Sequence, residues 1–264
     1  MTQIVTQIYD IFKNITNSIP KKKSKTNIII CDILKFNNHL TLNDFYELDY
    51  FDFNNKKLKI LPQIFCNIQI DGDLILSNNE LETLPKYFGN IIINGNLDLR
   101  NNKLKSLPQS FYNIQISGDL ILSNNELETL PEYFGNIIIS GNLDLRNNKL
   151  KSLPPSFCNI QIGGDLILSN NELETLPEYF GNIIISRNLN VSNNKLKSLP
   201  PSFYNIQING NLNLSNNNII YLSKNFSNIK IKGNLFLSNN IYILRYIKKY
   251  NFKFIKNIYI FYYR

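Results

Sequence analysis

The chain has 264 residues, of which 28 are Lys or Arg, 20 are Asp or Glu and one is His, so its formal net charge is +8. It contains no tract of 18 or more apolar residues, the length that a membrane-spanning helix needs. Its first ten residues, MTQIVTQIYD, lack the basic, apolar and small-residue regions of a secretory signal. We therefore expect a cytoplasmic protein in which Cys31, Cys66 and Cys158 are reduced thiols.

The net charge is concentrated at the C-terminal end. Residues 72–232 carry 13 basic and 13 acidic side chains, whereas the last 32 residues carry six basic and no acidic ones. The middle of the chain is therefore neutral, and any attraction to a polyanion is expected from the C-terminal end.

The N-terminal segment, residues 1–48, differs from the rest of the chain. It has apolar residues at helical spacing, which predict an amphipathic helix that caps the adjoining fold: Ile4, Ile8, Ile11, Phe12 and Ile15. A short basic run lies at Lys21, Lys22, Lys23 and Lys25. This run is typical of a nuclear-import signal or of a solvated linker, and the linker is the favoured interpretation.

From Asp49 onward the chain repeats itself every 23 residues. The segment 118–140 reads GDLILSNNELETLPEYFGNIIIS and recurs letter for letter at 164–186. A second version, GNLDLRNNKLKSLPQSFYNIQIS at 95–117, recurs with three changes at 141–163, so the full repeat is a pair of 46 residues. A fixed period of this length indicates a solenoid, in which each coil contacts only its neighbours. We expect the solenoid to span residues 49–232.

Each coil contains the same sequence of predicted elements. In the coil that begins at Gly95, Leu97 and Leu99 alternate with polar residues and predict a strand with one buried face. The pair Asn101–Asn102 predicts a turn, because Asn tolerates left-handed backbone geometry. Pro108 predicts an irregular or 3₁₀ segment, and residues 114–116 (Ile-Gln-Ile) predict a second short strand.

Stacking the coils in register brings equivalent residues together. One position of the repeat predicts an interior stack of aromatic rings: Phe65, Phe88, Phe111, Phe134, Phe157, Phe180, Phe203 and Phe226. The second Asn of each pair predicts a ladder of amides bound to turn backbone groups: Asn79, Asn102, Asn125, Asn148, Asn171, Asn194, Asn217 and Asn240.

The pattern Leu97-x-Leu99-x-x-Asn102-x-Leu104-x-x-Leu107-Pro108 resembles the leucine-rich repeat signature L-x-L-x-x-N-x-L, in the subclass that continues with L-x-x-L-P. The resemblance implies an α/β-type repeat solenoid that is mostly β. Such a solenoid is a right-handed horseshoe with a parallel sheet on its concave side and short irregular or 3₁₀ segments on its convex side, and it usually binds proteins. The tandem copies and the Asn-, Ile-, Lys- and Tyr-rich composition are also similar to repeat families of large DNA viruses of protists, which would place the protein in the host cytoplasm.

The outward positions of the L-x-L strands are the candidate partner-binding residues. Ile75, Ile121 and Ile167 are of particular interest because the interior positions are already filled without them. The complete predicted set on the concave face is Ile75, Asp98, Arg100, Ile121, Asp144, Arg146, Ile167, Asn190, Asn213 and Phe236. On the second strand of each coil, Gln alternates from coil to coil with the isoleucines Ile92, Ile138 and Ile184. These isoleucines either form a second exposed patch or are covered by local packing. Local packing is the favoured interpretation.

Charged residues after the Asn pairs alternate in sign from coil to coil: Glu80 and Glu82, Lys103 and Lys105, Glu126 and Glu128, Lys149 and Lys151, Glu172 and Glu174, Lys195 and Lys197. Residues 23 apart become neighbours in the stack, so two ladders of opposite charges are expected along one edge. They could form a recognition stripe, but the favoured role is to keep the coils soluble and in register.

The C-terminal segment, residues 233–264, begins with a degenerate coil and continues as IYILRYIKKYNFKFIKNIYIFYYR. Basic residues among Tyr and Phe are typical of a surface for nucleic acid or anionic membranes. A terminal coil also needs an apolar cover, and capping is the favoured role.

The sequence shows no set of residues that predicts catalysis. His39 is the only histidine and lies outside the repeats, and no Gly-rich phosphate loop occurs. The carboxylates of the repeats are expected in the ladders and at exposed strand positions, ionised and solvated. We therefore expect a monomeric, non-enzymatic scaffold without metal or cofactor that binds a protein partner. Binding of nucleic acid or membrane through the C-terminal segment, and a purely structural repeat protein, are the alternatives.

Overall fold

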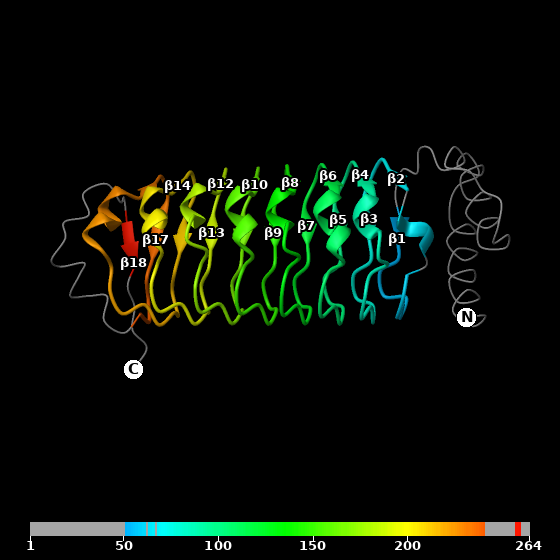
Figure 1. The fold of residues 1–264 in the computed structure, drawn as a ribbon, viewed down its shortest axis with the longest axis horizontal. Helices are drawn as coiled ribbons and strands as arrows, with labels where there is room; N and C mark the ends of the chain where they lie inside the picture. Colours follow the sequence, from blue (N-terminus) through cyan, green and yellow to red (C-terminus); the bar gives the residue numbers. More distant parts are fainter. Residues whose placement is uncertain (1–50, 62, 67, 241–256, 260–264) are drawn as a thin grey trace.

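A computed structural model describes residues 51–61, 63–66, 68–240 and 257–259. Their coils stand side by side in chain order along the long axis of the molecule (Figure 1). The strands form two parallel sheets, one of ten strands and one of eight, and no α-helix occurs among these residues. The solenoid expected from the repeat is confirmed. The helix predicted from Ile4 to Ile15, the lysine run, Cys31 and His39 lie outside the described residues.

The first sheet, called here the Leu sheet, contains the L-x-L segments, with β1 and β18 as its end strands. Its strands are β1 (Phe51–Asp52), β3 (Leu74–Ile75), β5 (Leu97–Asp98), β7 (Leu120–Ile121), β9 (Leu143–Asp144), β11 (Leu166–Ile167), β13 (Leu189–Asn190), β15 (Leu212–Asn213), β17 (Asn234–Phe236) and β18 (Asn257–Tyr259).

The second sheet, called here the Ile sheet, is built from the predicted second strand of each coil. Its strands are β2 (Gln69–Ile70), β4 (Ile92–Ile93), β6 (Gln115–Ile116), β8 (Ile138–Ile139), β10 (Gln161–Ile162), β12 (Ile184–Ile185), β14 (Gln207–Ile208) and β16 (Lys230–Ile231). Short 3₁₀ segments precede these strands: η3 (Gln63–Cys66), η4 (Phe88–Asn90), η5 (Gln109–Asn113), η6 (Phe134–Asn136), η7 (Pro155–Asn159), η8 (Phe180–Asn182), η9 (Pro201–Asn205) and η10 (Lys224–Asn228).

The strands pair at the repeat spacing. Leu97 lies opposite Leu120, and Leu166 lies opposite Leu189, so equivalent residues form straight rows across the sheet. Three residues after each L-x-L strand, the first Asn of the pair has a positive φ; Asn101 and Asn124 both have φ of 55°. The short polar side chain of Asn makes this left-handed turn accessible, so the predicted turn is confirmed.

The core lies between the two sheets and consists of the inward Leu, Ile and Phe residues. The predicted aromatic stack is present from Phe88 to Phe203, whereas Phe65 meets Phe53 edge-on. The ring of Phe111 is stacked between those of Phe88 and Phe134, with centroids 6.3 and 6.1 Å away. All three side chains are completely buried. Because each ring covers its neighbours, a coil gains its buried apolar surface only within the stack.

The predicted amide ladder is also present. The Nδ2 of Asn125 donates to the carbonyl oxygens of Leu99 and Leu122, at 3.0 and 3.1 Å. Its Oδ1 accepts from the backbone N–H of Leu104, one coil earlier, at 3.1 Å. One buried side chain thus satisfies backbone groups of two coils that irregular backbone would leave without partners.

Neighbouring 3₁₀ segments approach each other in pairs, which explains the 46-residue period. The Cβ of an alanine at Gly135 would overlap the carbonyl oxygen of Ser156, so only glycine permits this approach. The Ser156 hydroxyl accepts from the Gly135 N–H and donates to the Glu132 carbonyl. Ser110 makes the equivalent bridge between Gly89 and Lys86 and is partly buried.

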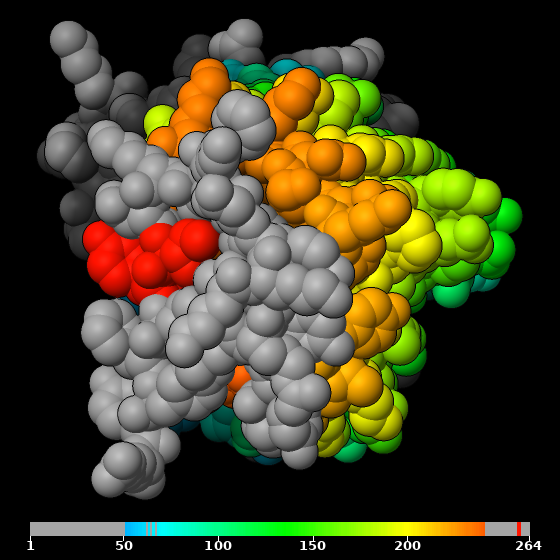
Figure 2. All heavy atoms as spheres, turned by 90° about the vertical axis from the view of Figure 1, so that its left-hand side faces the viewer, coloured from blue at the N-terminus to red at the C-terminus, as the bar shows by residue number. Residues whose placement is uncertain are grey.

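At the C-terminal end, β18 pairs in parallel with β17 as the last strand of the Leu sheet. Figure 2 views the molecule from this end, with residues 257–259 in red beside the orange last coil. The ring of Tyr259 stacks on Phe236 with centroids 5.0 Å apart, and Ile258 packs against the core. The strand therefore occupies the hydrogen-bonding edge of β17, the place where a cap is expected.

Candidate functional site

The outward face of the Leu sheet brings the predicted partner-binding positions into one row. Strand register places Ile75 beside Asp98, Asp98 beside Ile121, and Ile121 beside Asp144. The same row continues in chain order through Ile167, Asn190, Asn213, Phe236 and Tyr259. We call this row of residues, together with Arg100 and Arg146, the Leu face.

The Leu face contains two ion pairs built in the same way. The Asp98 carboxylate accepts from the backbone N–H and the Nε of Arg100, both at 3.0 Å, and lies 2.8 Å from its terminal NH2. In the second copy, Asp144 and the NH2 of Arg146 are 2.9 Å apart. The hydrogen bond to Asp98 raises the pKa of Arg100. Each pair fixes a guanidinium on the sheet surface and neutralises its charge.

These pairs correct one sequence-based expectation. The strand carboxylates were expected to be exposed and solvated, but the side chain of Asp98 is only 8% exposed and that of Asp144 is 7% exposed. The cause is local, because the arginine two residues later folds back over the carboxylate and covers it. The arginine side chains stay accessible, at 47% and 48%.

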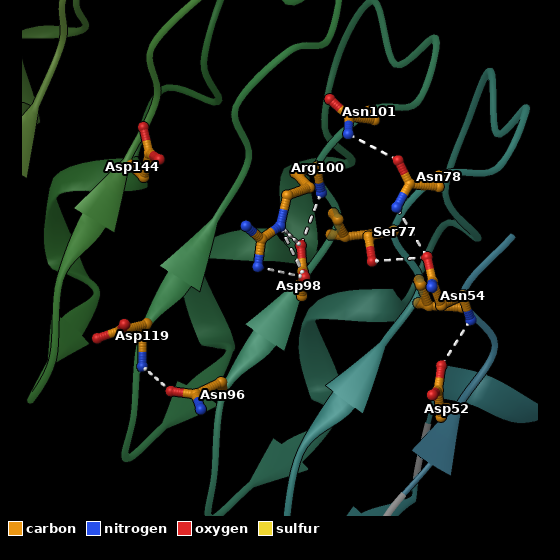
Figure 3. A network of polar contacts seen from close by, with 12 residues as sticks. Asp52, Asn54, Ser77, Asn78, Asn96, Asp98, Arg100, Asn101, Asp119 and Asp144 are labelled. Carbon is orange, nitrogen blue, oxygen red and sulfur yellow. Dashed lines mark hydrogen bonds and ion pairs between the residues drawn. The ribbon is translucent and has the colours of Figure 1, made fainter.

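A rigid polar border lies beside the row. Asp73, Asn96 and Asp119 lie one residue before the strands, and the side-chain oxygen of each accepts from the backbone N–H of the next coil at 2.6–2.7 Å. Beyond the strand ends, exposed Asn side chains bind each other, as Asn101 binds Asn78 at 2.7 Å (Figure 3). Hydrogen bonds on both sides therefore hold the Leu face in place.

The isoleucines Ile75, Ile121 and Ile167 are partly exposed between the ion pairs. Toward the C-terminal end the face becomes neutral and polar. Asn190 and Asn213 accept from the backbone N–H of Ser192 and Ser215, the same contact that Asp98 makes with Arg100. The face thus offers half-buried apolar side chains, oriented guanidinium groups and fixed amides.

The Ile sheet corrects a second expectation. Ile92, Ile138 and Ile184 were expected to be covered by local packing, but Ile138 is 64% exposed and Ile184 is 58% exposed; Ile92 is partly exposed. The chain passes directly from each strand of the Ile sheet into the next strand of the Leu sheet, as from Ile93 to Leu97. Within the described residues, this connection leaves no segment to cover the outward side chains.

The charged ladders form pairs in which a lysine binds the glutamate of the coil before it. The Nζ to Oε2 distance is 3.1 Å for Lys103–Glu80, 2.8 Å for Lys149–Glu126 and 2.7 Å for Lys195–Glu172. The hydrogen bond between Lys149 and Glu126 lowers the pKa of the Glu126 carboxyl and raises the pKa of the Lys149 ammonium group. Both groups lie at the surface, where screening is strong.

We predict that changing Lys103, Lys105, Lys149 and Lys151 to Glu lowers stability without abolishing partner binding. Each favourable neighbour contact becomes repulsive, and added salt should restore the midpoint of urea unfolding because the charges are screened. In the unchanged protein, the ion pair of Glu126 contributes to the free energy of unfolding when the pH is above the pKa of glutamate in the unfolded chain. This contribution is lost as the pH falls through the lowered pKa of Glu126 in the folded protein. Loss of binding at unchanged stability would instead make the ladders a recognition stripe.

The cysteines and carboxylates of the described residues form no further chemical site. Cys66 and Cys158 are free and buried, and burial raises the pKa of both thiols. No group of three or more His, Cys, Asp or Glu side chains could hold a metal ion within residues 51–61, 63–66, 68–240 and 257–259. No helix in the described residues is long and apolar enough to cross a membrane.

Comparisons with known proteins agree with this geometry. Residues 142–160 and 187–206 match the Leucine Rich Repeat family. The leucine-rich repeat domain of a Shigella effector is 21% identical with a TM-score of 0.51, over 71% of this chain and 80% of that one. No curated protein matches the sequence.

Two further solved structures are similar over shorter parts of their own length. YopM from Yersinia enterocolitica WA-314 is 24% identical with a TM-score of 0.47, over 88% of this chain and 48% of that one. A chain of the Drosophila Toll–Spätzle complex is 20% identical with a TM-score of 0.45, over 84% of this chain and 36% of that one. The family match and the two parallel sheets show that this chain carries leucine-rich repeats in a mostly β solenoid.

Proposed function

We propose that the chain is a non-enzymatic scaffold that binds a protein partner through the Leu face. The observation that carries this proposal is the in-register row of isoleucines and Asp–Arg pairs on the outward side of the Leu sheet. Leucine-rich repeat proteins commonly act as protein-interaction scaffolds, which supports the same function.

The chemistry of the Leu face suits a protein surface better than a polyanion. Arg100 and Arg146 are each neutralised by an adjacent carboxylate, so the row has no excess positive charge. Ile75, Ile121 and Ile167 supply apolar area between the pairs, and arginine is enriched among the residues that dominate binding energy at protein interfaces. Because Asp98 fixes the Arg100 side chain before binding, less conformational entropy is lost on association.

The finer predictions belong to the same proposal. Residues 1–48 and 233–264 are proposed as end segments that close the solenoid, which the position of β18 supports at the C-terminal end. Free thiols at Cys66 and Cys158 favour a reducing compartment such as the cytoplasm. The 23-residue subclass and the relation to repeat families of large viruses of protists stay predictions.

The function is tested by capture from a lysate of the cells that produce the protein, with identification by mass spectrometry. The test variant changes Ile75, Ile121 and Ile167 to Glu, and the matched control changes Ile92, Ile138 and Ile184 to Glu. We expect the test variant to lose the partner and the control to retain it. If both variants retained the partner equally, the Leu face would be excluded as its binding surface.

A salt series separates protein binding from the two other functions. Between about 50 and about 200 mM salt, apolar contacts persist whereas binding to RNA or anionic vesicles falls steeply. Steep loss in this series would assign binding to the basic C-terminal residues. Absence of any specific capture would favour a purely structural role.

A further inference from the structure

The outward side of the Ile sheet is an exposed surface that the Leu face does not use. We call it the Ile face, and its central row runs in strand register through Gln69, Ile92, Gln115, Ile138, Gln161, Ile184, Gln207 and Lys230. A second row lies one position past the strand ends and is exposed throughout: Asp71, Asn94, Ser117, Ser140, Gly163, Ser186, Asn209 and Lys232.

The charges of these two rows are confined to their two ends. Within these two rows, Asp71 lies in the first coil, and Lys230 and Lys232 lie in the last. Every position between the end coils is Ile, Gln, Asn, Ser or Gly. An exposed apolar and amide surface with opposite charges at its ends is complementary to its own reversed copy.

The arrangement of the rows fits a two-fold axis that runs parallel to the strands and lies between two facing copies. Such an axis places the first coil of one copy against the last coil of the other, so that Asp71 faces Lys232 and Gln69 faces Lys230. It also places each isoleucine opposite a glutamine, as Ile138 opposite Gln161. The isoleucines of the two copies then alternate along one line and interdigitate, with coil neighbours about 4.8 Å apart.

The outer row obeys the same symmetry. Under this axis, Asn94 faces Asn209, Ser117 faces Ser186, and Ser140 faces Gly163, so side chains of similar size meet between the two end coils. The small residues Ser140 and Gly163 lie nearest the axis. The other face-to-face arrangement, with equal coils opposed, would place Lys230 against Lys230 and Ile138 against Ile138. Like charges that face each other are unfavourable.

We propose that a second copy of this chain binds the Ile face, giving a symmetric dimer in which the coils run in opposite order. The contact is isologous, because each copy offers the same surface to the other. Eight strands at about 4.8 Å give a contact about 34 Å long. This inference replaces the monomer expected from the sequence and leaves the Leu face of both copies free.

The dimer is tested by light scattering of the full chain over a range of concentrations. Ile138 lies beside the axis in both copies, so Ile138→Glu brings two carboxylates together and should raise the dimer Kd on the order of a hundredfold. The matched control, Ile121→Glu on the Leu face, should leave the mass unchanged. Ile138 is exposed and Ile121 is partly exposed, so both variants are expected to fold, and circular dichroism checks this.

A charge exchange tests the antiparallel order of the coils. Asp71→Lys in one variant, and Lys230→Glu with Lys232→Glu in another, should each weaken the dimer, because like charges then face each other at both ends. Mixing the two variants should restore dimers that contain one copy of each. The proposal fails if the unchanged chain is monomeric at all concentrations, if Ile138→Glu leaves the dimer intact, or if mixing restores nothing. If the chain is monomeric and hydrogen exchange shows that the Ile face is protected, the face is covered by another segment of the same chain rather than by a second copy.

Discussion

Replacing Asn125 by Ala is expected to destabilise the protein by about 2–4 kcal/mol. The change leaves the buried N–H of Leu104 without its side-chain acceptor and removes one donor each from the carbonyl oxygens of Leu99 and Leu122. These carbonyls retain Asn102 and Asn148 as donors, so the N–H accounts for the largest part of the loss. The measurement is the free energy of unfolding in urea.

The neighbouring residue Asn124 provides the matched control. It is exposed and has a φ of 55°, a conformation that glycine adopts without strain, so Asn124→Gly should cost less than about 1 kcal/mol. Asn124→Ala should cost about 1–2 kcal/mol, since alanine is strained at positive φ. Similar losses for Asn124→Gly and Asn125→Ala would contradict the assigned roles of the two residues.

Replacing Phe111 by Ala is expected to cost about 3–5 kcal/mol, because it opens a cavity between Phe88 and Phe134. Ser106 is an exposed position of the same coil, and Ser106→Ala should cost less than about 0.5 kcal/mol. Hydrogen exchange should accelerate first in the coils on either side of Phe111, because each coil contacts only its neighbours. Equal losses at Phe111 and Ser106 would contradict the position of the aromatic stack.

The stacked features could be predicted from the sequence because a fixed spacing sets the register. Phe111 and Asn125 have equivalents in every full coil, so one coil's pattern predicts both the aromatic stack and the amide ladder. The same spacing predicts which residues share a row, and strand pairing from Ile75 to Asp98 and onward agrees with it. Register is a property of the repeat itself and needs no knowledge of side-chain conformation.

Exposure was harder to predict, because it depends on what covers a residue. Asp98 and Arg100 are two residues apart, the spacing of same-face neighbours on a strand, and this signal could have predicted the covered carboxylate. Ile138 offered no comparable signal, since an isoleucine in a strand fits a covered or an open sheet equally well. The role of Gly135 depends on the approach of Ser156 from the next coil, which no single coil reveals.

The two outward faces are proposed to bind different partners, and site-specific photo-crosslinking tests that assignment most directly. A photoreactive phenylalanine analogue is placed at position 121 on the Leu face or at position 138 on the Ile face of the full chain, and the crosslinked products are identified by mass spectrometry. We predict that position 121 crosslinks to a different protein and position 138 to a second copy of this chain. Crosslinks from position 121 only to a second copy, or from position 138 only to a different protein, would contradict the assignment.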